Sequence, residues 1–151
     1  MPQLSYIIKT PEEMITLGEA IGRIAYPNLV LALNGNLGAG KTTLTKGIGK
    51  ALGITKVINS PTFTTMKIYE GRLNLYHLDV YRITDPNSDF ELEEYFEMGG
   101  LTVIEWATQI ETLLPVDTVN IDLVINEDTT RTAFITASES FIEALQKEVT
   151  R

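Results

Sequence analysis

The residues with the clearest chemical pattern form a glycine-rich run that ends in a lysine and a threonine. The run is Gly35-Asn36-Leu37-Gly38-Ala39-Gly40-Lys41-Thr42, and it has the spacing G-x-x-x-x-G-K-[ST]. Its glycines let the backbone turn until several N–H groups point at one phosphate. Lys41 can then reach the β- and γ-phosphates of a nucleotide, and the Thr42 hydroxyl can bind Mg²⁺. We therefore assign ATP contacts to this run and to Thr43, with Lys41 catalytic and Thr42 a metal ligand.

The sequence on either side of the run supports this interpretation. Residues Leu29–Leu33 are apolar and typical of a buried strand, and Lys41–Leu52 has the pattern of a helix that Gly53 ends. This context separates a phosphate loop from an ordinary glycine turn with a solvated lysine, because the start of the helix adds positive potential. The guanine-reading motif Asn-Lys-x-Asp is absent from the sequence, which favours ATP over GTP.

A phosphate loop needs a second Mg²⁺ anchor, normally an acidic residue at the end of a buried strand. Two candidates are present: Leu101–Ile104 leads into Glu105, and Leu73–Leu78 leads into Asp79. The first stretch is the more apolar and so resembles a central strand. We assign Glu105 to the metal and Asp79 to orienting water or holding a switch segment, both as catalytic residues. The alternative for each is a capping or salt-bridging acid.

Three further positions are less specific. His77 is the only histidine, and a lone histidine beside a strand is more often a hydrogen-bonded structural group than a catalyst. Arg82 would balance phosphate charge or pair with an acid. Thr62 and Thr64 follow Ser60-Pro61, where a hydroxyl can sense the γ-phosphate; the alternative is that the proline only shapes a turn.

The remaining pattern predicts an α/β fold: a P-loop NTPase-like mixed sheet flanked by helices, with antiparallel hairpins. Thr10 caps a helix that begins at Pro11, with Glu13 completing a capping box. The acidic and aromatic residues of Asp89–Glu97 indicate one or two helical turns. Their aromatic side chains either enter the core, which is the commoner case, or face a partner protein. The other expected elements are hairpins of Thr64–Tyr69 with Leu73–His77 and of Thr118–Ile125 with Thr132–Thr136, a short strand at Val57-Ile58, a helix at Ala107–Leu114 and a last helix capped by Ser138 or Ser140.

Length and composition set the broad class. The 151 residues favour one domain spanning 1–151. The absence of cysteine excludes disulfides, zinc–thiolate sites, iron–sulfur clusters and a cysteine nucleophile. The first twenty residues lack the apolar core of a secretory signal, and Leu29–Leu33 is far too short to cross a bilayer. We therefore expect a cytoplasmic protein with no membrane partner.

Charge bears on nucleic acid binding. The net charge is −8, whereas proteins that grip nucleic acid unaided usually carry a basic surface. Five basic residues near the loop would form a local patch or, as is commoner, a solvated face: Lys46, Lys50, Lys56, Lys67 and Arg72. If RNA is involved, we expect a partner to hold most of it.

Four stretches in combination resemble one known family. They are GNLGAGKTTLTKG (Gly35–Gly47), SPTFTTMKIY (Ser60–Tyr69), LYHLDVYRI (Leu75–Ile83) and EYFEMGGLTVIEW (Glu94–Trp106). Together they resemble the TsaE family, formerly YjeE, of bacterial ATPases needed to form threonylcarbamoyladenosine at position 37 of tRNAs that read codons beginning with A. The resemblance covers Thr10 to about Glu111, with weaker likeness through Arg131.

The resemblance implies roles beyond those argued from the residues. Thr10 and Arg131 would contact the nucleotide base or ribose, Glu105 would be the metal-site acid, and Asp79 would be required for activity. The partners would be TsaB and TsaD, with TsaD performing the carbamoyl transfer and the ATPase resetting that complex between turnovers. tRNA would be met only through the complex. Two positions depart mildly from the family: Asn36 stands where an acid is usual, and Thr65 where a larger apolar residue is common.

Other functions remain open on the sequence alone. A small-molecule kinase could use the same loop, but it would need an acceptor pocket and usually an arginine-rich lid, which the chain does not show. A nucleotide-sensing module with little turnover would bind ATP tightly, with partner assembly indifferent to Asp79→Asn. Direct RNA binding would give salt-sensitive tRNA affinity. For the hydrolase we expect slow turnover alone and faster turnover with partners, because Arg82 is the only obvious arginine finger.

Overall fold

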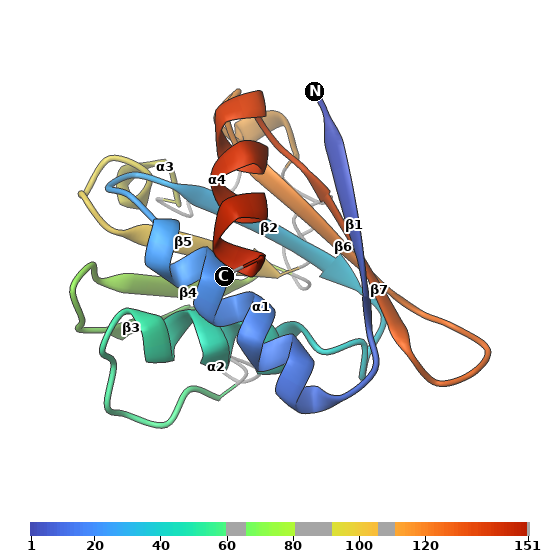
Figure 1. The fold of residues 1–151 in the computed structure, drawn as a ribbon. Helices are drawn as coiled ribbons and strands as arrows, with labels where there is room; N and C mark the ends of the chain where they lie inside the picture. The colour runs from blue at the N-terminus through green and yellow to red at the C-terminus, as the bar shows by residue number, and fades with distance from the viewer. Residues whose placement is uncertain (60–65, 81–91, 106–110, 151) are drawn as a thin grey trace.

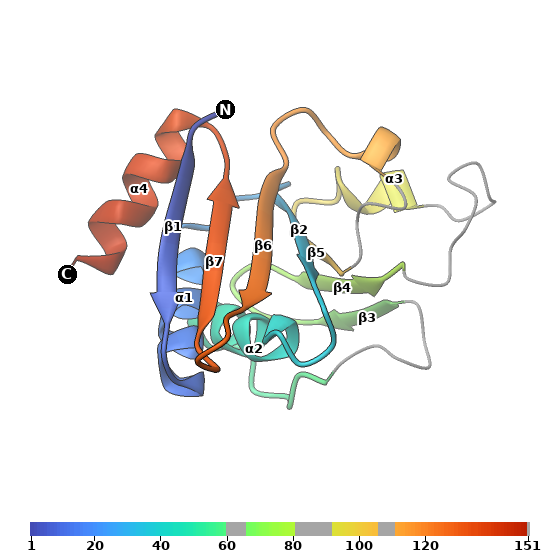
Figure 2. The same cartoon turned by 90° about the vertical axis from the view of Figure 1, so that its right-hand side faces the viewer.

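In the part of the chain that the computed structural model describes, residues 1–59, 66–80, 92–105 and 111–150, seven strands form one sheet. The strands are β1 (Gln3–Ile8), β2 (Val30–Gly35), β3 (Met66–Tyr69), β4 (Leu75–Asp79), β5 (Leu101–Glu105), β6 (Val119–Ile125) and β7 (Arg131–Thr136). Their order across the sheet is β1-β7-β6-β2-β5-β4-β3. Figure 2 shows these strands fanning out as the sheet twists.

The strands at the centre of the sheet are parallel. β2 runs parallel to β5 and β6, and β4 runs parallel to β5, whereas β1, β7 and β3 join by antiparallel pairing. The carboxyl ends of β2, β4, β5 and β6 therefore meet at one edge of the sheet. β1 ends at this same edge and β7 begins there, because each pairs antiparallel with its neighbour. Parallel sheets bind ligands outside the carboxyl ends of their strands.

Three helices cover one face of the sheet: α1 (Pro11–Ile24), α2 (Lys41–Ala51) and α4 (Glu139–Val149) (Figure 1). The short helix α3 (Leu92–Tyr95) belongs to the opposite face, where Tyr95 and Phe96 pack with apolar residues of β2, β4 and β5. These two aromatic side chains therefore enter the core, as the commoner reading of their acidic segment predicted.

Alternation along the strands separates the two faces. Leu31 and Leu33 of β2 pack toward the helices, and Val30 and Ala32 pack toward α3. The same alternation in β4 and β5 puts His77, Asp79 and Glu105 on the helix side, together with Leu75 and Val103. This face also receives α2 and the loop before it. The sheet thus presents its acidic residues to the glycine-rich loop.

Helices α1 and α2 cross at very close range. A Cβ added to Gly18 would lie 2.2 Å from the Leu44 carbonyl oxygen, and one added to Gly47 would lie 2.2 Å from that of Ile15. Only glycine allows backbones to approach so closely. Because α1 begins at Pro11, directly after its cap Thr10, and α2 begins at Lys41, this contact fixes the first helix against the phosphate loop.

Most of the expected elements are confirmed. Thr10 caps α1 by accepting from the Glu13 N–H, Ser138 caps α4 by accepting from that of Phe141, and both hairpins form. The strand predicted at Val57-Ile58 is wrong, since these residues join no strand. Ile58 is instead buried against Gly49 of α2, so its apolar character reflects packing on a helix rather than strand pairing.

Several predictions concern residues that the structure does not describe. These are Thr62, Thr64, Arg82 and the first part of the helix expected at Ala107–Leu114. Residues 111–113 form a short helical turn. No helix among the described residues is long and apolar enough to cross a membrane.

Candidate nucleotide-binding site

The glycine-rich run forms a loop between the central strand β2 and helix α2. Gly38 and Gly40 adopt φ of +84° and +110°, a region that other residues rarely occupy. The Ala39 N–H donates to the Asn36 carbonyl oxygen at 3.0 Å, which closes the turn. The Leu37 side chain is 92% exposed at the tip, so only its backbone is placed to contact a ligand in the loop.

Lys41 lies beneath this loop and is unusually buried for a lysine. Its side chain is only 7% exposed, and Nζ donates to the Gly35 carbonyl oxygen at 2.6 Å. Burial lowers the pKa of Lys41, and the negative charges of Glu105 and Asp79 partly oppose this by raising it. The ammonium therefore points back across the loop and sits within the field of both acids.

The two acids predicted from the strand pattern are brought together. Asp79 and Glu105 are register partners at the carboxyl ends of the parallel strands β4 and β5. Glu105 is 3% exposed, whereas Asp79 is half-buried. The Val80 N–H donates to the Glu105 carbonyl oxygen at 3.3 Å, which extends the pairing one residue past the strand. Both carboxylates thus belong to the same side of the sheet as Lys41.

His77 contacts one of these acids. Its Nε2 lies 2.7 Å from Glu105 Oε2, and the imidazole is fully buried. The expectation that this lone histidine is hydrogen-bonded is confirmed. The sequence did not predict its contact with Glu105, because the two residues are 28 positions apart.

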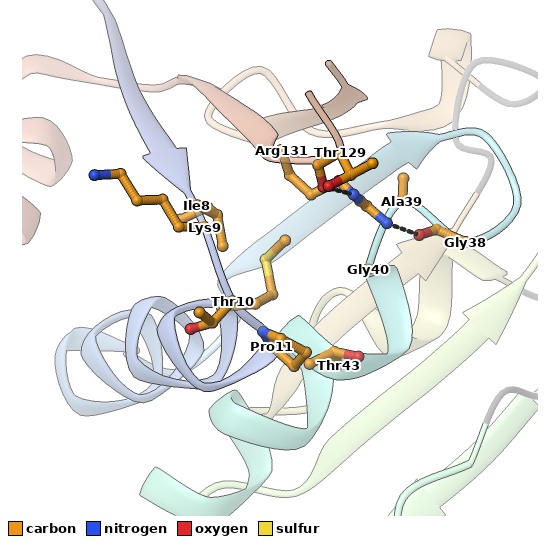
Figure 3. Close-up of a pocket in the computed structure, with 11 residues that line it drawn as sticks. Ile8, Lys9, Thr10, Pro11, Gly38, Ala39, Gly40, Thr43, Thr129 and Arg131 are labelled. Atoms are coloured by element: carbon orange, nitrogen blue, oxygen red, sulfur yellow. Dashed lines mark hydrogen bonds between the residues drawn. The ribbon is translucent and has the colours of Figure 1, made fainter. Parts of the chain in front are cut away.

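A cavity of about 220 Å³ opens beside the loop, and Thr10, Thr43 and Arg131 are among its lining residues. Figure 3 shows Thr10 and Pro11 on one side of it and Arg131 with Thr129 on the other. Arg131 donates to the Gly38 and Thr129 carbonyl oxygens, the first at 3.2 Å, and so ties the β6–β7 hairpin to the loop.

The cavity also includes residues that sequence reasoning missed. They include Ile8, Met14 and Thr129, none of which is among the residues predicted to bind the nucleotide. Met14 approaches the loop closely, since a Cβ on Gly40 would meet its Cε at 2.8 Å. No sequence signal marks these three, because their contribution depends on how α1 and the hairpin approach the loop.

The residues present fit a phosphate group and Mg²⁺. Gly40 caps α2 without any side-chain hydrogen bond, so the first N–H groups of the helix have no side-chain cap to compete with an anion. A buried lysine and an open turn of backbone stand beside them. Thr42, half-buried in the first turn of α2, Asp79 and Glu105 carry oxygen ligands of the kind that Mg²⁺ prefers.

The central parallel strands and the loop between β2 and α2 define a P-loop NTPase-like fold. The family model described as "Threonylcarbamoyl adenosine biosynthesis protein TsaE" matches residues 8–133. The chain belongs to the TsaE family.

Individual relatives agree with this assignment. The chain is 43% identical to the tRNA threonylcarbamoyladenosine biosynthesis protein TsaE of Bacillus subtilis, covering 100% of this chain and 96% of that one. It is 38% identical to the Treponema pallidum protein of the same name, covering 83% and 94%. The crystal structure of Bacillus subtilis YdiB superposes with a TM-score of 0.85 at 39% identity, covering 99% of this chain and 95% of that chain.

Proposed function

We propose that this protein is a Mg²⁺-dependent ATP hydrolase that serves tRNA threonylcarbamoyladenosine biosynthesis by acting on the TsaB–TsaD complex. One observation carries the hydrolase assignment: the buried lysine of the phosphate loop lies in the field of two acids that end neighbouring parallel strands. Phosphoryl transfer depends mainly on positioning and charge, and these groups supply both.

Each residue has a defined part in this proposal. The loop backbone from Gly35 to Thr43 holds the phosphates, and Lys41 turns from the Gly35 carbonyl to the β- and γ-phosphates. Thr42 and Glu105 would hold Mg²⁺, which when bound neutralises charge on the phosphate oxygens. Asp79, the more exposed acid, would orient the attacking water. Thr10 and Arg131 line the cavity that would take the base or ribose.

The place in tRNA modification rests on family membership. The curated relatives are named as tRNA threonylcarbamoyladenosine biosynthesis proteins. With a net charge of −8, the chain is poorly suited to hold tRNA by itself, so it would meet tRNA through its partners. Arg131, the arginine of the described cavity, hydrogen-bonds to the Gly38 carbonyl oxygen. Because Arg82 is the only obvious arginine finger in the sequence, we expect a group from the partners to speed hydrolysis.

Reconstituted tRNA modification tests the proposal. With tRNA in excess over the TsaB–TsaD pair, adding this protein and ATP should support many rounds of modification, because hydrolysis resets the complex. Lys41→Ala and Glu105→Ala should leave no more than the first round. If both variants support repeated rounds as well as the unaltered protein does, hydrolysis at this site has no part in the pathway.

A further inference from the structure

The contact between His77 and Glu105 has no part in the functions assigned so far. His77 is 0% exposed, and its Nε2 lies 2.7 Å from Glu105 Oε2. Of the neighbours of His77 on this face of the sheet, Leu75 and Val103 are apolar, whereas Asp79 and the register partner Lys67 are charged. An apolar side chain would fill such a position without the cost of burying an imidazole. The polar residue is therefore explained by what it does for the carboxylate.

The contact joins a ring nitrogen to a carboxylate oxygen. A carboxylate oxygen accepts, so Nε2 is the atom that can donate to Oε2. Among the described residues, Nδ1 has no hydrogen-bond partner, so the contact with Glu105 is the hydrogen bond that orients the ring.

The geometry points to His77 as a positioning residue that holds the Glu105 carboxylate in the orientation needed for Mg²⁺. This inference rests on the proposed Mg-ATP site. A carboxylate offers about four lone-pair sites, and His77 occupies one of them on Oε2. The remaining sites stay available on a side chain that can no longer rotate freely. Partners behind a metal ligand orient it in this way in many metal sites.

A matched pair of substitutions separates positioning from simple packing. In His77→Gln the amide nitrogen can reach the place of Nε2 and keep the hydrogen bond to Glu105. In His77→Asn the amide ends near the place of Nδ1 and falls short. Both place a neutral amide in the same buried site, so they share much of the cost of the change. Should His77→Asn not fold, His77→Leu removes the hydrogen bond while preserving most of the volume.

The readout is ATP affinity by calorimetry across a Mg²⁺ titration and in EDTA, with thermal unfolding measured in parallel. Mg²⁺ should tighten ATP binding, and His77→Asn should raise the Mg²⁺ concentration that gives half of this effect by about 10- to 100-fold. That is the usual effect of losing a partner behind a metal ligand. His77→Gln should restore most of this. ATP affinity in EDTA should be the same for all three proteins, because the phosphate loop itself is unaltered.

Two other results would overturn the inference, and they can be told apart. If both variants lose stability while their Mg²⁺ requirement stays that of the unaltered protein, His77 is a packing residue and the inference is wrong. If the unaltered protein shows no tightening of ATP binding by Mg²⁺, the proposed metal site itself fails and the role of His77 falls with it.

Discussion

Asp79 and Glu105 stand opposite each other in register at the carboxyl ends of the parallel strands β4 and β5. The negative charge of each raises the pKa of Lys41, but the surroundings of the two carboxylates differ. Glu105 is buried and held by His77, whereas Asp79 is half-buried at the rim. A fixed carboxylate suits a metal ligand, and a more exposed one suits contact with water. We therefore propose that Glu105 binds the metal and that Asp79 acts on the attacking water.

This division predicts different effects for the two isosteric substitutions. Glu105→Gln should weaken Mg²⁺-dependent ATP binding by at least the roughly 10- to 100-fold that loss of a supporting partner costs. Asp79→Asn should slow turnover while leaving ATP affinity close to that of the unaltered protein. Calorimetry and steady-state hydrolysis on the same preparations check both. The opposite pattern, with affinity lost only in Asp79→Asn, would mean that the two acids have been assigned the wrong way round.

The pKa of Lys41 predicts a pH-dependent contribution to stability. Burial lowers this pKa below its ordinary 10.5, so in the window just under 10.5 the unfolded chain binds more protons than the folded one. The free energy of unfolding gains from Lys41 as pH rises through that window, and loses as pH falls. Relative to Lys41→Met, the unaltered protein should become progressively more stable as pH approaches 10.5. Urea unfolding of both proteins at several alkaline pH values measures this, and parallel profiles would contradict it.

The close crossing of α1 and α2 predicts a large loss of stability for Gly47→Ala. The added Cβ would meet the Ile15 carbonyl oxygen at 2.2 Å, so the helices must separate. The free energy of unfolding should fall by about 3 kcal/mol or more. Lys46→Ala, at the exposed neighbouring position, should change it by no more than about 0.5 kcal/mol. Chemical denaturation measures both, and equal effects would exclude a tight crossing at Gly47.

Arg131 should affect nucleotide affinity rather than the chemical step. It holds the Gly38 carbonyl from the far side of the cavity, away from the acids. Arg131→Ala should raise the KM for ATP by roughly two- to twelvefold, equivalent to one hydrogen bond of about 0.5–1.5 kcal/mol, with kcat unchanged. Lys147→Ala is the control, because this exposed lysine of α4 is not among the residues that line the cavity. A fall in kcat for Arg131→Ala would place this residue in the chemistry instead.

Local patterns in the sequence were enough to predict the phosphate loop and its neighbours. The spacing of Gly35, Gly40 and Lys41, between an apolar stretch and a helical one, depends on residues close together in the chain. The same holds for the cap at Thr10 and the two hairpins. Strand ends also marked Asp79 and Glu105 separately as candidate acids.

Contacts between distant segments were not predictable in this way. Nothing in the sequence pairs β4 with β5, so the register of Asp79 with Glu105 and the contact of His77 with Glu105 appear only in the fold. Val57-Ile58 shows the converse: two apolar residues suggest a strand, but Ile58 packs on Gly49 of α2. Val57 beside it is 73% exposed, so two adjacent apolar residues predict neither a strand nor the burial of both side chains.

The most direct test of the account is steady-state ATP hydrolysis by this protein, alone and with the TsaB–TsaD pair, with Lys41→Ala and Glu105→Ala as controls. We expect slow hydrolysis alone and a marked increase with the pair, because a partner-supplied group can accelerate phosphoryl transfer by about 10³- to 10⁵-fold. Both controls should abolish the activity. A rate that the pair leaves unchanged, or that survives in Lys41→Ala, would contradict an accessory ATPase built on the loop between β2 and α2.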